Sequence, residues 1–413
     1  MADPRTTPPQ PRNLFKNSQY RWLLAGNTAM FFGFFGTMLL RSLLVWEVTG
    51  DEIALAYVNV LAAAGMFATS MVSGVLIDRY ERKRFLLLAQ VTILCAESMI
   101  LVLLLLDELS YTALLLNAAA SSIAFPFIMP SRTAMLVAAV DRSVLASATA
   151  WMSAGVNAGR MISPAAVGIF ADIIGFVFCY TAILILHGVS LLCTFGLTRY
   201  PAPMTTRQGL LREMLLGFNY IIEHRSLGLC ILFGMLPMLI VIPLQQLLVV
   251  YVDDIWQSGS SGLGLMMAAT GIGGMLGSLS MALVRESLVG PMLLGSVAVG
   301  AVLLVFGHVP WFWLAVLAAG IVFAASVLTH TAVQVAVQFL SEDFIRGRVT
   351  TITMMSMSVA PMGTLFLAYA TQALGAPWAI TFSGAALILV SLLFWALLPA
   401  FRRIDELCSQ GAH

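Results

Sequence analysis

The sequence contains very little charge for its length, and this scarcity excludes most classes of soluble protein. Only 10% of the 413 residues are Asp, Glu, Lys or Arg, whereas 60% are hydrophobic. Soluble globular domains carry about a quarter of their residues as charged side chains. A chain of this composition cannot cover its surface with groups that water solvates well. We therefore expect lipid to be its main solvent.

The chain also has few residues that could hold a metal, form a disulfide framework or perform catalysis. Its five cysteines show no C-x-x-C spacing, and four of them lie within apolar runs. This pattern predicts neither a disulfide scaffold nor a metal site. The five histidines and few buried acids supply no His–carboxylate or Ser–His constellation for a membrane-embedded enzyme. We expect no enzymatic activity, no cofactor, no metal and no nucleic-acid partner.

Long apolar runs occupy most of the sequence and predict twelve membrane-spanning helices. A helix needs about 20 predominantly apolar residues to cross a bilayer. The predicted spans are 23–48, 53–77, 85–106, 111–129, 145–171, 176–197, 227–249, 263–284, 290–307, 311–339, 349–374 and 376–398. The predicted fold class is an all-α membrane protein.

The placement of Lys and Arg predicts the topology. Apart from Arg41 and Arg160, every Lys and Arg lies in the N-terminal arm, after an even-numbered span or in the C-terminal tail. The loops after odd-numbered spans carry acids instead, such as Asp51, Asp107 and Asp253. Because cytoplasmic loops are enriched in Lys and Arg, we expect both termini in the cytoplasm.

The longest polar interruption, at 198–226, divides the spans into two sets of six. The predicted organisation is a cytoplasmic arm at 1–22, a six-helix bundle at 23–197, a cytoplasmic linker at 198–226, a second six-helix bundle at 227–398 and a cytoplasmic tail at 399–413. Apolar residues at helical spacing in the linker indicate an amphipathic helix on the membrane surface, or an ordinary linker with a helical turn or two. A weak repeat between 62–80 and 268–286 suggests two related halves.

The loop after the second span contains a motif with six fixed positions. They are Gly74, Leu76, Asp78, Arg79, Arg82 and Lys83. This pattern resembles the loop signature of the major facilitator superfamily, G-x-L-x-D-R-x-G-R-[RK], with Glu81 in place of the second glycine. In that family the motif latches the cytoplasmic gate. The resemblance implies that Asp78 contacts Arg132 or the start of the eleventh span near Thr350. The alternative is a positive-inside cluster without a gating role.

The spelling D-R-Y-E-R-K resembles the branch of that superfamily that contains the enterobactin exporter and macrolide-efflux-type carriers. Pro130-Ser-Arg132, Arg346-Gly347-Arg348 and the segment 210–224 point to the same branch. The resemblance implies the major facilitator fold, two pseudo-symmetric six-helix bundles that work by alternating access. It also implies a monomeric exporter in the bacterial inner membrane that takes a small molecule, preferably a siderophore. Multidrug or lysolipid efflux is the alternative within this class, and a non-transporting sensor or scaffold is the alternative outside it.

The fifth predicted span contains a degraded form of the signature of drug–proton antiporters, G-x-x-x-G-P-x-x-G-G. It begins at Gly159 and keeps Pro164 and Gly168, but Ser163 and Val167 replace two glycines. The signature favours exchange against protons. A Gly/Pro pair that bends a helix is the alternative.

Three ionisable residues lie deep within predicted spans, namely Arg41, Glu97 and Arg160. Each costs at least about 2.5–3.5 kcal/mol in hydrocarbon, so each should face protein or water. We expect the arginines to bind an anionic substrate and Glu97 to carry the proton, or all three to form a structural pairing. Polar side chains that could assist binding, or simply bond between helices, are Asn27, Asn157, Gln245, Gln246 and Gln334. His187 and His330 are also within spans, where packed histidines are more common than relays.

Overall fold

Helices account for all the regular structure in the described part of the chain. The computed structural model describes residues 11–79, 81–141, 144–198, 210–281, 287–342, 345, 349, 352–353, 360 and 363–410, without the side chains of 11–13, 71–72, 74–79, 146, 210–215 and 408–410. In the first half the elements are η1 (Pro11–Lys16), α1 (Ser18–Thr49), α2 (Glu52–Arg79), α3 (Arg82–Leu105), α4 (Tyr111–Ala124), η2 (Phe125–Phe127), α5 (Ile128–Ala139), α6 (Leu145–Ile173) and α7 (Phe176–Phe195).

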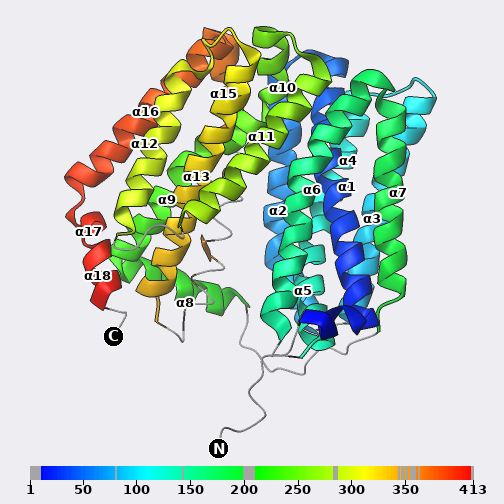
Figure 1. The fold of residues 1–413 in the computed structure, drawn as a ribbon, viewed down its shortest axis with the longest axis horizontal. Coiled ribbons are helices and arrows are strands. Elements are labelled where there is room, and N and C mark those ends of the chain that lie inside the picture. The colour runs from blue at the N-terminus through cyan, green and yellow to red at the C-terminus, as the bar shows by residue number, and fades with distance from the viewer. Residues whose placement is uncertain are drawn as a thin grey trace, which may run out of the picture. The chain divides into compact units, whose positions relative to one another are not determined.

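The second half begins with α8 (Leu210–Glu223), the amphipathic segment between the two sets of predicted spans. It continues with α9 (Arg225–Gln246), α10 (Leu248–Tyr251), η4 (Val252–Trp256), α11 (Gly259–Ser280), α12 (Val289–Phe306), α13 (Phe312–Leu340), α15 (Gly363–Leu374), α16 (Ala376–Leu397), α17 (Pro399–Arg402) and α18 (Ile404–Gln410). Figure 1 follows these elements from blue to red along the chain.

Ten helical segments among the described residues are long and apolar enough to cross a membrane. They are Ser18–Thr49, Glu52–Ser70, Arg82–Leu105, Tyr111–Ala139, Phe176–Phe195, Arg225–Gln246, Gly259–Ser280, Val289–Phe306, Phe312–Leu340 and Ala376–Leu397. The prediction of an all-α, multi-pass membrane protein is confirmed. The helix α6 forms where the fifth span is predicted, but its Gly, Ser, Asn and Arg content keeps it out of this set. Much of the predicted eleventh span lies outside the described residues, and α15 is its end.

The chain divides into two compact units. The first unit contains Met1–Arg41 and Ala64–Thr205, and the second contains Ser42–Ala63 and Thr206–His413. Helices α1 and α2 are continuous, so each contributes residues to both units. We call residues 42–63, which belong to the second unit, the α1–α2 corner. The predicted boundaries of two six-helix bundles stay a prediction.

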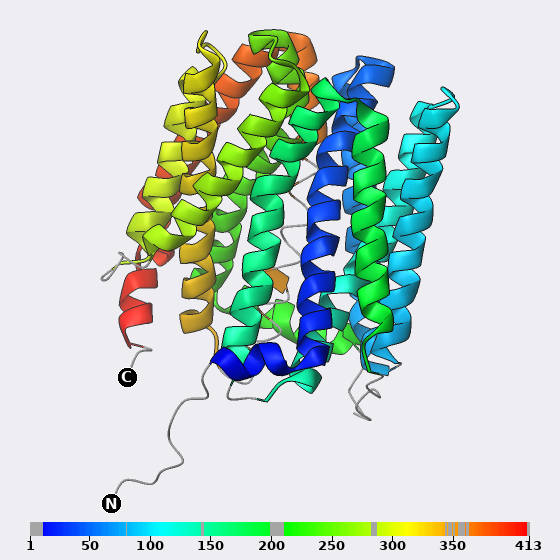
Figure 2. The same cartoon turned by 45° about the vertical axis from the view of Figure 1, so that its right-hand side comes forward.

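In the first unit, α3 packs against α4, α5 and α7; these helices are coloured from light blue to green in Figure 2. Polar side chains fix the beginning of α1 to its neighbours. Asn17 Nδ2 donates to the Ala139 carbonyl at 2.7 Å, and the Tyr20 hydroxyl donates to the Ala148 carbonyl at 3.2 Å. Asn17 also caps α1, because its Oδ1 accepts from the backbone N–H of Gln19 at 2.9 Å. These bonds position α1 for the site that it carries.

In the second unit, α13 is central and packs against α9, α11 and α12, while α12 also packs against α16 (Figure 1). The crossing of α11 and α13 depends on glycine. A Cβ at Gly273 would strike the Gly320 carbonyl, and one at Gly277 would strike the Ala324 carbonyl. The first unit contains a related crossing of α2 and α4, where Gly65 faces the Ser122 side chain. Small residues allow such close helix approach in membranes.

The last apolar helix of each half follows a turn that requires glycine. Gly175 (φ 105°) precedes α7, and Gly375 (φ 81°) precedes α16. Residues with a Cβ rarely adopt this backbone conformation. A glycine with positive φ thus precedes the last apolar helix in both halves, which agrees with the weak repeat in the sequence.

Candidate substrate and proton site

Arg160 lies at the crossing of α6 and α1, which is built from small residues. A Cβ at Gly159 would lie 3.1 Å from the backbone of Phe31 and Phe32, so only a small residue fits there comfortably. One turn further along, Ser163 Oγ donates to the Phe32 carbonyl at 2.6 Å. This close approach brings the Arg160 guanidinium over the Phe35 ring, with Cζ 5.3 Å from the ring centroid. The geometry is that of a cation–π contact.

Phenylalanine side chains of α1 form an aromatic cluster beside this arginine. Phe34 is 5.4 Å from Phe35 and 6.3 Å from Phe31, measured between ring centroids. Phe125 completes the cluster and stacks on Phe34 at 4.1 Å with the rings 21° apart. Arg160 itself is exposed, while most of the aromatic surface is at least half-buried. A solute there would meet a positive charge next to aromatic faces.

Phe125 was not expected from the sequence. It belongs to η2, a short 3₁₀ turn that joins α4 to α5 within the fourth span. The segment Phe125-Pro126-Phe127 contains the one available signal, because a proline within a span interrupts the α-helical bonding and redirects nearby side chains. Only the packing of η2 against α1 shows that Phe125 meets Phe34.

Glu97 is buried inside the first unit, where polar groups of several helices surround it. It lies on α3 and is 1% exposed. Ser121 Oγ on α4 donates to its Oε1 at 3.3 Å, and Asn117 lies nearby one turn earlier on α4. Its Oε2 has no hydrogen-bond partner among the described residues. A carboxyl group in this position can take up a proton without breaking an ion pair.

Arg41 is half-buried in α1, and its positive charge interacts electrostatically with Glu97. The hydroxyl of Tyr180 on α7 is buried in the same neighbourhood and has no hydrogen-bond partner within the described residues. The structure thus brings Arg41 and Glu97 into one neighbourhood. Arg160 is in a separate one with the aromatic cluster.

The uncharged polar residues that the sequence singled out fall into two kinds. Asn27 is buried and donates from Nδ2 to the Met152 carbonyl at 3.2 Å, so it ties α1 to α6. Gln246 is buried and accepts a hydrogen bond from Thr364 Oγ1 at 2.5 Å. By contrast Asn157 is exposed one turn before Arg160, and Gln245 and Gln334 are half-buried. Their part in substrate binding stays a prediction.

The basic residues of the gating motif anchor the start of α3 within the first unit. Arg82 Nη1 donates to the Ala134 carbonyl of α5 at 3.3 Å. Lys83 Nζ donates to the carbonyls of Phe195 and Leu197 at 2.9 and 2.5 Å, at the C-terminal end of α7. A cation there also interacts favourably with the helix dipole. Gly74, Asp78 and Arg79 lie in α2, but their side chains are outside the described residues, as is Thr350.

Arg132 is buried in the helix bundle rather than exposed at a loop. It is 1% exposed, and its Nη2 donates to Ser190 Oγ of α7 at 2.8 Å while its Nη1 donates to the Leu23 carbonyl at 3.4 Å. Ser190 Oγ in turn donates to the Gly26 carbonyl at 2.8 Å, and Gln90 Nε2 donates to Ser190 Oγ at 2.8 Å. Arg132 therefore joins α1, α5 and α7. The predicted latch between it and Asp78 stays a prediction.

The second unit holds the α1–α2 corner by contacts with η4 and α15. Trp46 Nε1 donates to Asp253 Oδ2 at 2.9 Å, and the hydroxyls of Tyr57 and Tyr369 lie 3.4 Å apart. The charged residues near this contact, Glu52, Asp253 and Asp254, are acidic. Partial burial raises the pKa of Asp254, and the negative charges of Glu52 and Asp253 raise it further. Within the described residues, no three His, Cys, Asp or Glu side chains are arranged to hold a metal ion.

The arrangement of helices places the chain among known transporters. A peptide transporter of the POT family in complex with sulfate superposes with a TM-score of 0.74 at 15% identity, over 94% of this chain and 95% of that one. The nucleoside transporter NupG gives a TM-score of 0.72 at 12% identity, over 92% and 98%. At such identities the likeness shows the fold alone. The chain has the fold of the major facilitator transporters. The family profile and the named relatives in the next paragraph make it a transporter rather than an enzyme.

The sequence comparison defines the family within this class. The profile of the transmembrane secretion effectors matches residues 11–411, so the chain belongs to that family. The enterobactin exporter EntS of Escherichia coli O1:K1 is 26% identical over 352 residues, which are 84% of this chain and 83% of that protein. The enterobactin exporter EntS of Citrobacter koseri is 27% identical over the same shares of the two chains.

Proposed function

We propose that this protein is an exporter of an amphipathic, anionic small molecule such as a siderophore, and that it exchanges this solute for protons. It would work by alternating access between two six-helix bundles of a twelve-span chain in the bacterial inner membrane, as a monomer with both termini in the cytoplasm. Relatives named as enterobactin exporters support the substrate class. The Lys and Arg distribution of the loops supports the orientation.

The observation that carries this proposal is the position of Arg160. The residue is deep within the predicted fifth span, it is exposed, and its guanidinium lies 5.3 Å from the centre of the Phe35 ring. An arginine inside a membrane protein needs a partner, and guanidinium pairs well with carboxylate, phosphate and ionised phenol groups. The stacked rings of Phe34 and Phe125 offer an apolar surface next to that charge. An anion with an apolar or aromatic body satisfies both.

Glu97 is the residue that we propose for proton coupling. It is buried, with one oxygen bonded to Ser121 and the other without a partner in the described part of the chain. Protonation removes the cost of burying its negative charge, whereas deprotonation lets it interact with Arg41. The protonated and deprotonated states of Glu97 differ by one negative charge in the neighbourhood that Glu97 shares with Arg41. Such a difference could bias the packing of α1, on which the aromatic cluster also lies.

A second candidate is multidrug or lysolipid efflux. The aromatic cluster favours it, because phenylalanine faces also bind cationic and purely apolar solutes. A non-transporting sensor or scaffold is the candidate from another class. Flux across a sealed membrane separates the transporters from the sensor, and the charge of the transported solute separates the two transporters.

The test is flux of charged aromatic probes in proteoliposomes, with 8-anilinonaphthalene-1-sulfonate as the anion and ethidium as the cation. We expect the wild type to move the anion, and Arg160→Gln to slow this at least about tenfold, as expected for a lost charge-assisted hydrogen bond. Arg160→Lys should keep part of the activity, because ammonium pairs less well with planar anions.

Arg402→Gln is the matched control for this test. Arg402 also lies over an aromatic ring, with Cζ 5.9 Å from the centre of the Trp395 ring, but it follows the last apolar helix. Its loss should leave anion flux unchanged. Ethidium flux that exceeds anion flux and survives in Arg160→Gln would instead establish multidrug efflux. No flux of either probe above that of protein-free vesicles would leave the sensor as the better account.

A further inference from the structure

His187 on α7 is a buried ionisable residue without a role in the mechanism proposed above. Its side chain is 3% exposed, and neither Nδ1 nor Nε2 has a hydrogen-bond partner in the described part of the chain. Buried polar atoms are normally bonded, because an unpaired one loses its hydration without compensation. Two unpaired nitrogens on one ring therefore need an explanation.

The ring of His187 lies directly against the backbone of α1. A Cβ at Gly33 would lie 2.7 Å from Cε1 and 2.9 Å from Nε2 of the imidazole, so the ring occupies the space over this glycine. Gly33 is next to Phe34, which stacks on Phe125 in the aromatic cluster. A change in the charge or orientation of His187 would thus act on the segment of α1 that carries the cluster.

Helices α3 and α7 lie side by side, and two contacts show how they are aligned (Figure 1). Lys83 at the start of α3 donates from Nζ to the Phe195 carbonyl at the end of α7, at 2.9 Å. Two turns further along α3, Gln90 donates from Nε2 to Ser190 Oγ at 2.8 Å. Residue numbers rise along α3 while they fall along α7, so the two helices are antiparallel.

This alignment directs Glu97 of α3 and His187 of α7 toward each other. Glu97 follows Gln90 by two further turns on the same face of α3, which makes it level with Ile183 on α7. His187 is one turn from Ile183, or about 6 Å along the helix axis. Helical side chains lean toward the N-terminus of their own helix. Because the helices are antiparallel, Glu97 leans toward the level of His187, and His187 leans toward the level of Glu97.

Glu97 is also the chemically suitable partner among the ionisable side chains around α7. Those deep within the described helices are Arg41 of α1, Glu97 of α3, Arg132 of α5 and Arg160 of α6, together with Cys179, Tyr180 and Cys193 on α7 itself. Arginine keeps its proton, and a thiol or phenol holds its proton to higher pH than a carboxyl group does. Glu97 is therefore the group with which an imidazole can exchange a proton near neutral pH.

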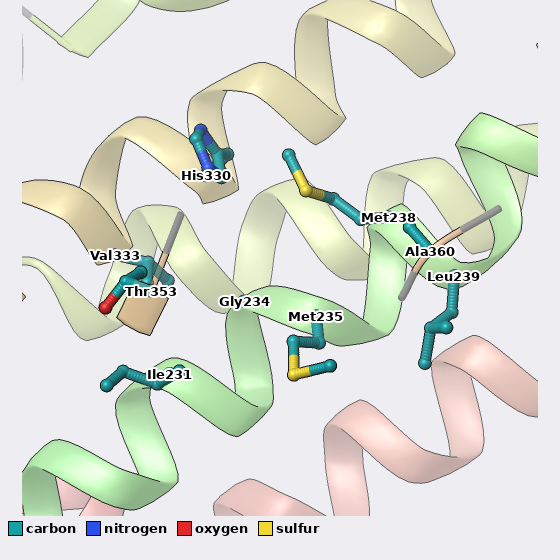
Figure 3. A pocket seen from close by; sticks show the side chains of 9 residues that line it. All are labelled: Ile231, Gly234, Met235, Met238, Leu239, His330, Val333, Thr353 and Ala360. Carbon is teal, nitrogen blue, oxygen red and sulfur yellow. The ribbon is translucent and has the colours of Figure 1, made fainter. Parts of the chain in front are cut away.

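His330 of α13 is a contrasting histidine in the second unit. It lines a pocket of about 10 Å³, which has room for about one water molecule (Figure 3). The described residues that line this pocket include no Asp, Glu, Lys or Arg. That lining contains no acid with which His330 could exchange a proton, so His330 is a reference for His187 within the same molecule.

We propose that His187 and Glu97 form a two-residue proton site, in which one proton moves between the Glu97 carboxyl group and the His187 imidazole. In one state the acid and the imidazole are both neutral, and the ring lies over Gly33. In the other state the proton has left Glu97 Oε2 for a ring nitrogen, and the imidazolium turns from Gly33 toward the carboxylate. The proposal rests on the proton coupling proposed above and names the second residue of that site.

The test is a pH titration of the full-length protein in detergent by NMR, with 15N-labelled histidine. The nitrogen shifts report the charge of each ring, and the signal of His187 is the one that is missing in His187→Gln. We expect His187 in the wild type to become charged as the pH falls from about 8 to about 5. In Glu97→Gln it should stay neutral over this range, because the carboxylate that stabilises the imidazolium is absent.

Three comparisons locate the effect. The signal of His330 should be the same in the wild type and in Glu97→Gln. Asp141→Asn is the matched control, because it removes an exposed aspartate outside these helices, and it should leave the titration of His187 unchanged. Glu97→Asp keeps the carboxylate and guards against misfolding of Glu97→Gln, so His187 should still titrate in this variant.

A His187 ring that titrates alike in the wild type and in Glu97→Gln would overturn the proposal. A ring that stays neutral in the wild type over the whole pH range would overturn it as well. Either result is distinct from failure of the proposed function, because flux driven by a pH gradient can depend on Glu97 alone. Conversely, the coupled titration can be present in a protein that transports no anion.

Discussion

The two units of this protein differ in how they treat charge. The first unit contains the charged groups that lie deep within helices, namely the buried Glu97 and Arg132, the half-buried Arg41 and the exposed Arg160. In the second unit, α11, α12, α13 and α16 contain no charged residue, and α9 has one only at its first position. The lesson is that two units built from similar apolar helices need not carry the same chemistry. The residues that we propose for the anion and for the proton both belong to the first unit.

The largest expected effect concerns the helix crossings, which also differ between the units. Gly273→Ala should severely destabilise the protein, by about 3 kcal/mol or more, because its Cβ would strike the backbone carbonyl of Gly320, which cannot move aside. Gly65→Ala should cost less, because the obstacle there is the Ser122 side chain, which can rotate. Thermal unfolding in detergent, monitored by aggregation, would compare the two. Equal losses would mean that the crossings are equally tolerant.

A second prediction concerns the polar web around Arg132. Ser190→Ala removes the acceptor of the Arg132 and Gln90 hydrogen bonds and leaves both donors buried. We expect a loss of about 1–3 kcal/mol. In the second unit, Ser391→Ala is the contrast, because the buried Ser391 Oγ has no partner among the described residues. Melting temperatures of the two variants would show this difference, and a harmless Ser190→Ala would remove the structural role that we give to Arg132.

The smallest effect is expected at the α1–α2 corner. The pKa of Asp254 is raised in the folded state, first by partial burial and then by Glu52 and Asp253. The folded state therefore binds this proton more tightly than the unfolded state does. The resulting stability is present at low pH and is lost as the pH rises through the raised pKa.

We expect Asp254 to make the melting temperature of the wild type higher at pH 4 than at pH 7 by only about 1 °C, because the residue is exposed and its charge is screened. In Asp254→Asn this difference should disappear. Asp141→Asn, which changes an exposed aspartate outside the corner, should keep the shift. A shift of the opposite sign, in which the corner is tighter at pH 7, would show that ionised Asp254 stabilises the contact.

The fold class could be predicted from the sequence more completely than the surroundings of the site residues. Hydropathy and the Lys/Arg alternation depend on the bilayer, which acts on every segment in the same way, so the all-α membrane fold followed from them. The helix α6 shows the limit of this signal, because Gly155 and Gly159, which let it approach α1, lower its hydropathy together with Asn157 and Arg160.

Side-chain surroundings were harder to predict, because they depend on contacts between helices distant in the chain. Depth within a span identified Arg160 and Glu97 as unusual, but it could not distinguish Asn27, which bonds to α6, from Asn157, which is exposed. The stacking of Phe125 on Phe34 had no sequence signal beyond the neighbouring Pro126. Arg132 has the burial of a core residue in a segment whose sequence resembles a gate.

The most direct test of proton-coupled anion export is the exchange of 8-anilinonaphthalene-1-sulfonate across proteoliposome membranes. It is measured with and without a pH gradient, in the wild type and in Glu97→Gln. We predict that a pH gradient accelerates anion flux by the wild type severalfold. In Glu97→Gln, which keeps the size and the Ser121 bond of the side chain, counterflow without a gradient should persist while the acceleration is lost. Acceleration that is intact in Glu97→Gln, or wild-type anion flux no faster than in protein-free vesicles, would contradict the claim that the first unit couples anion export to protons.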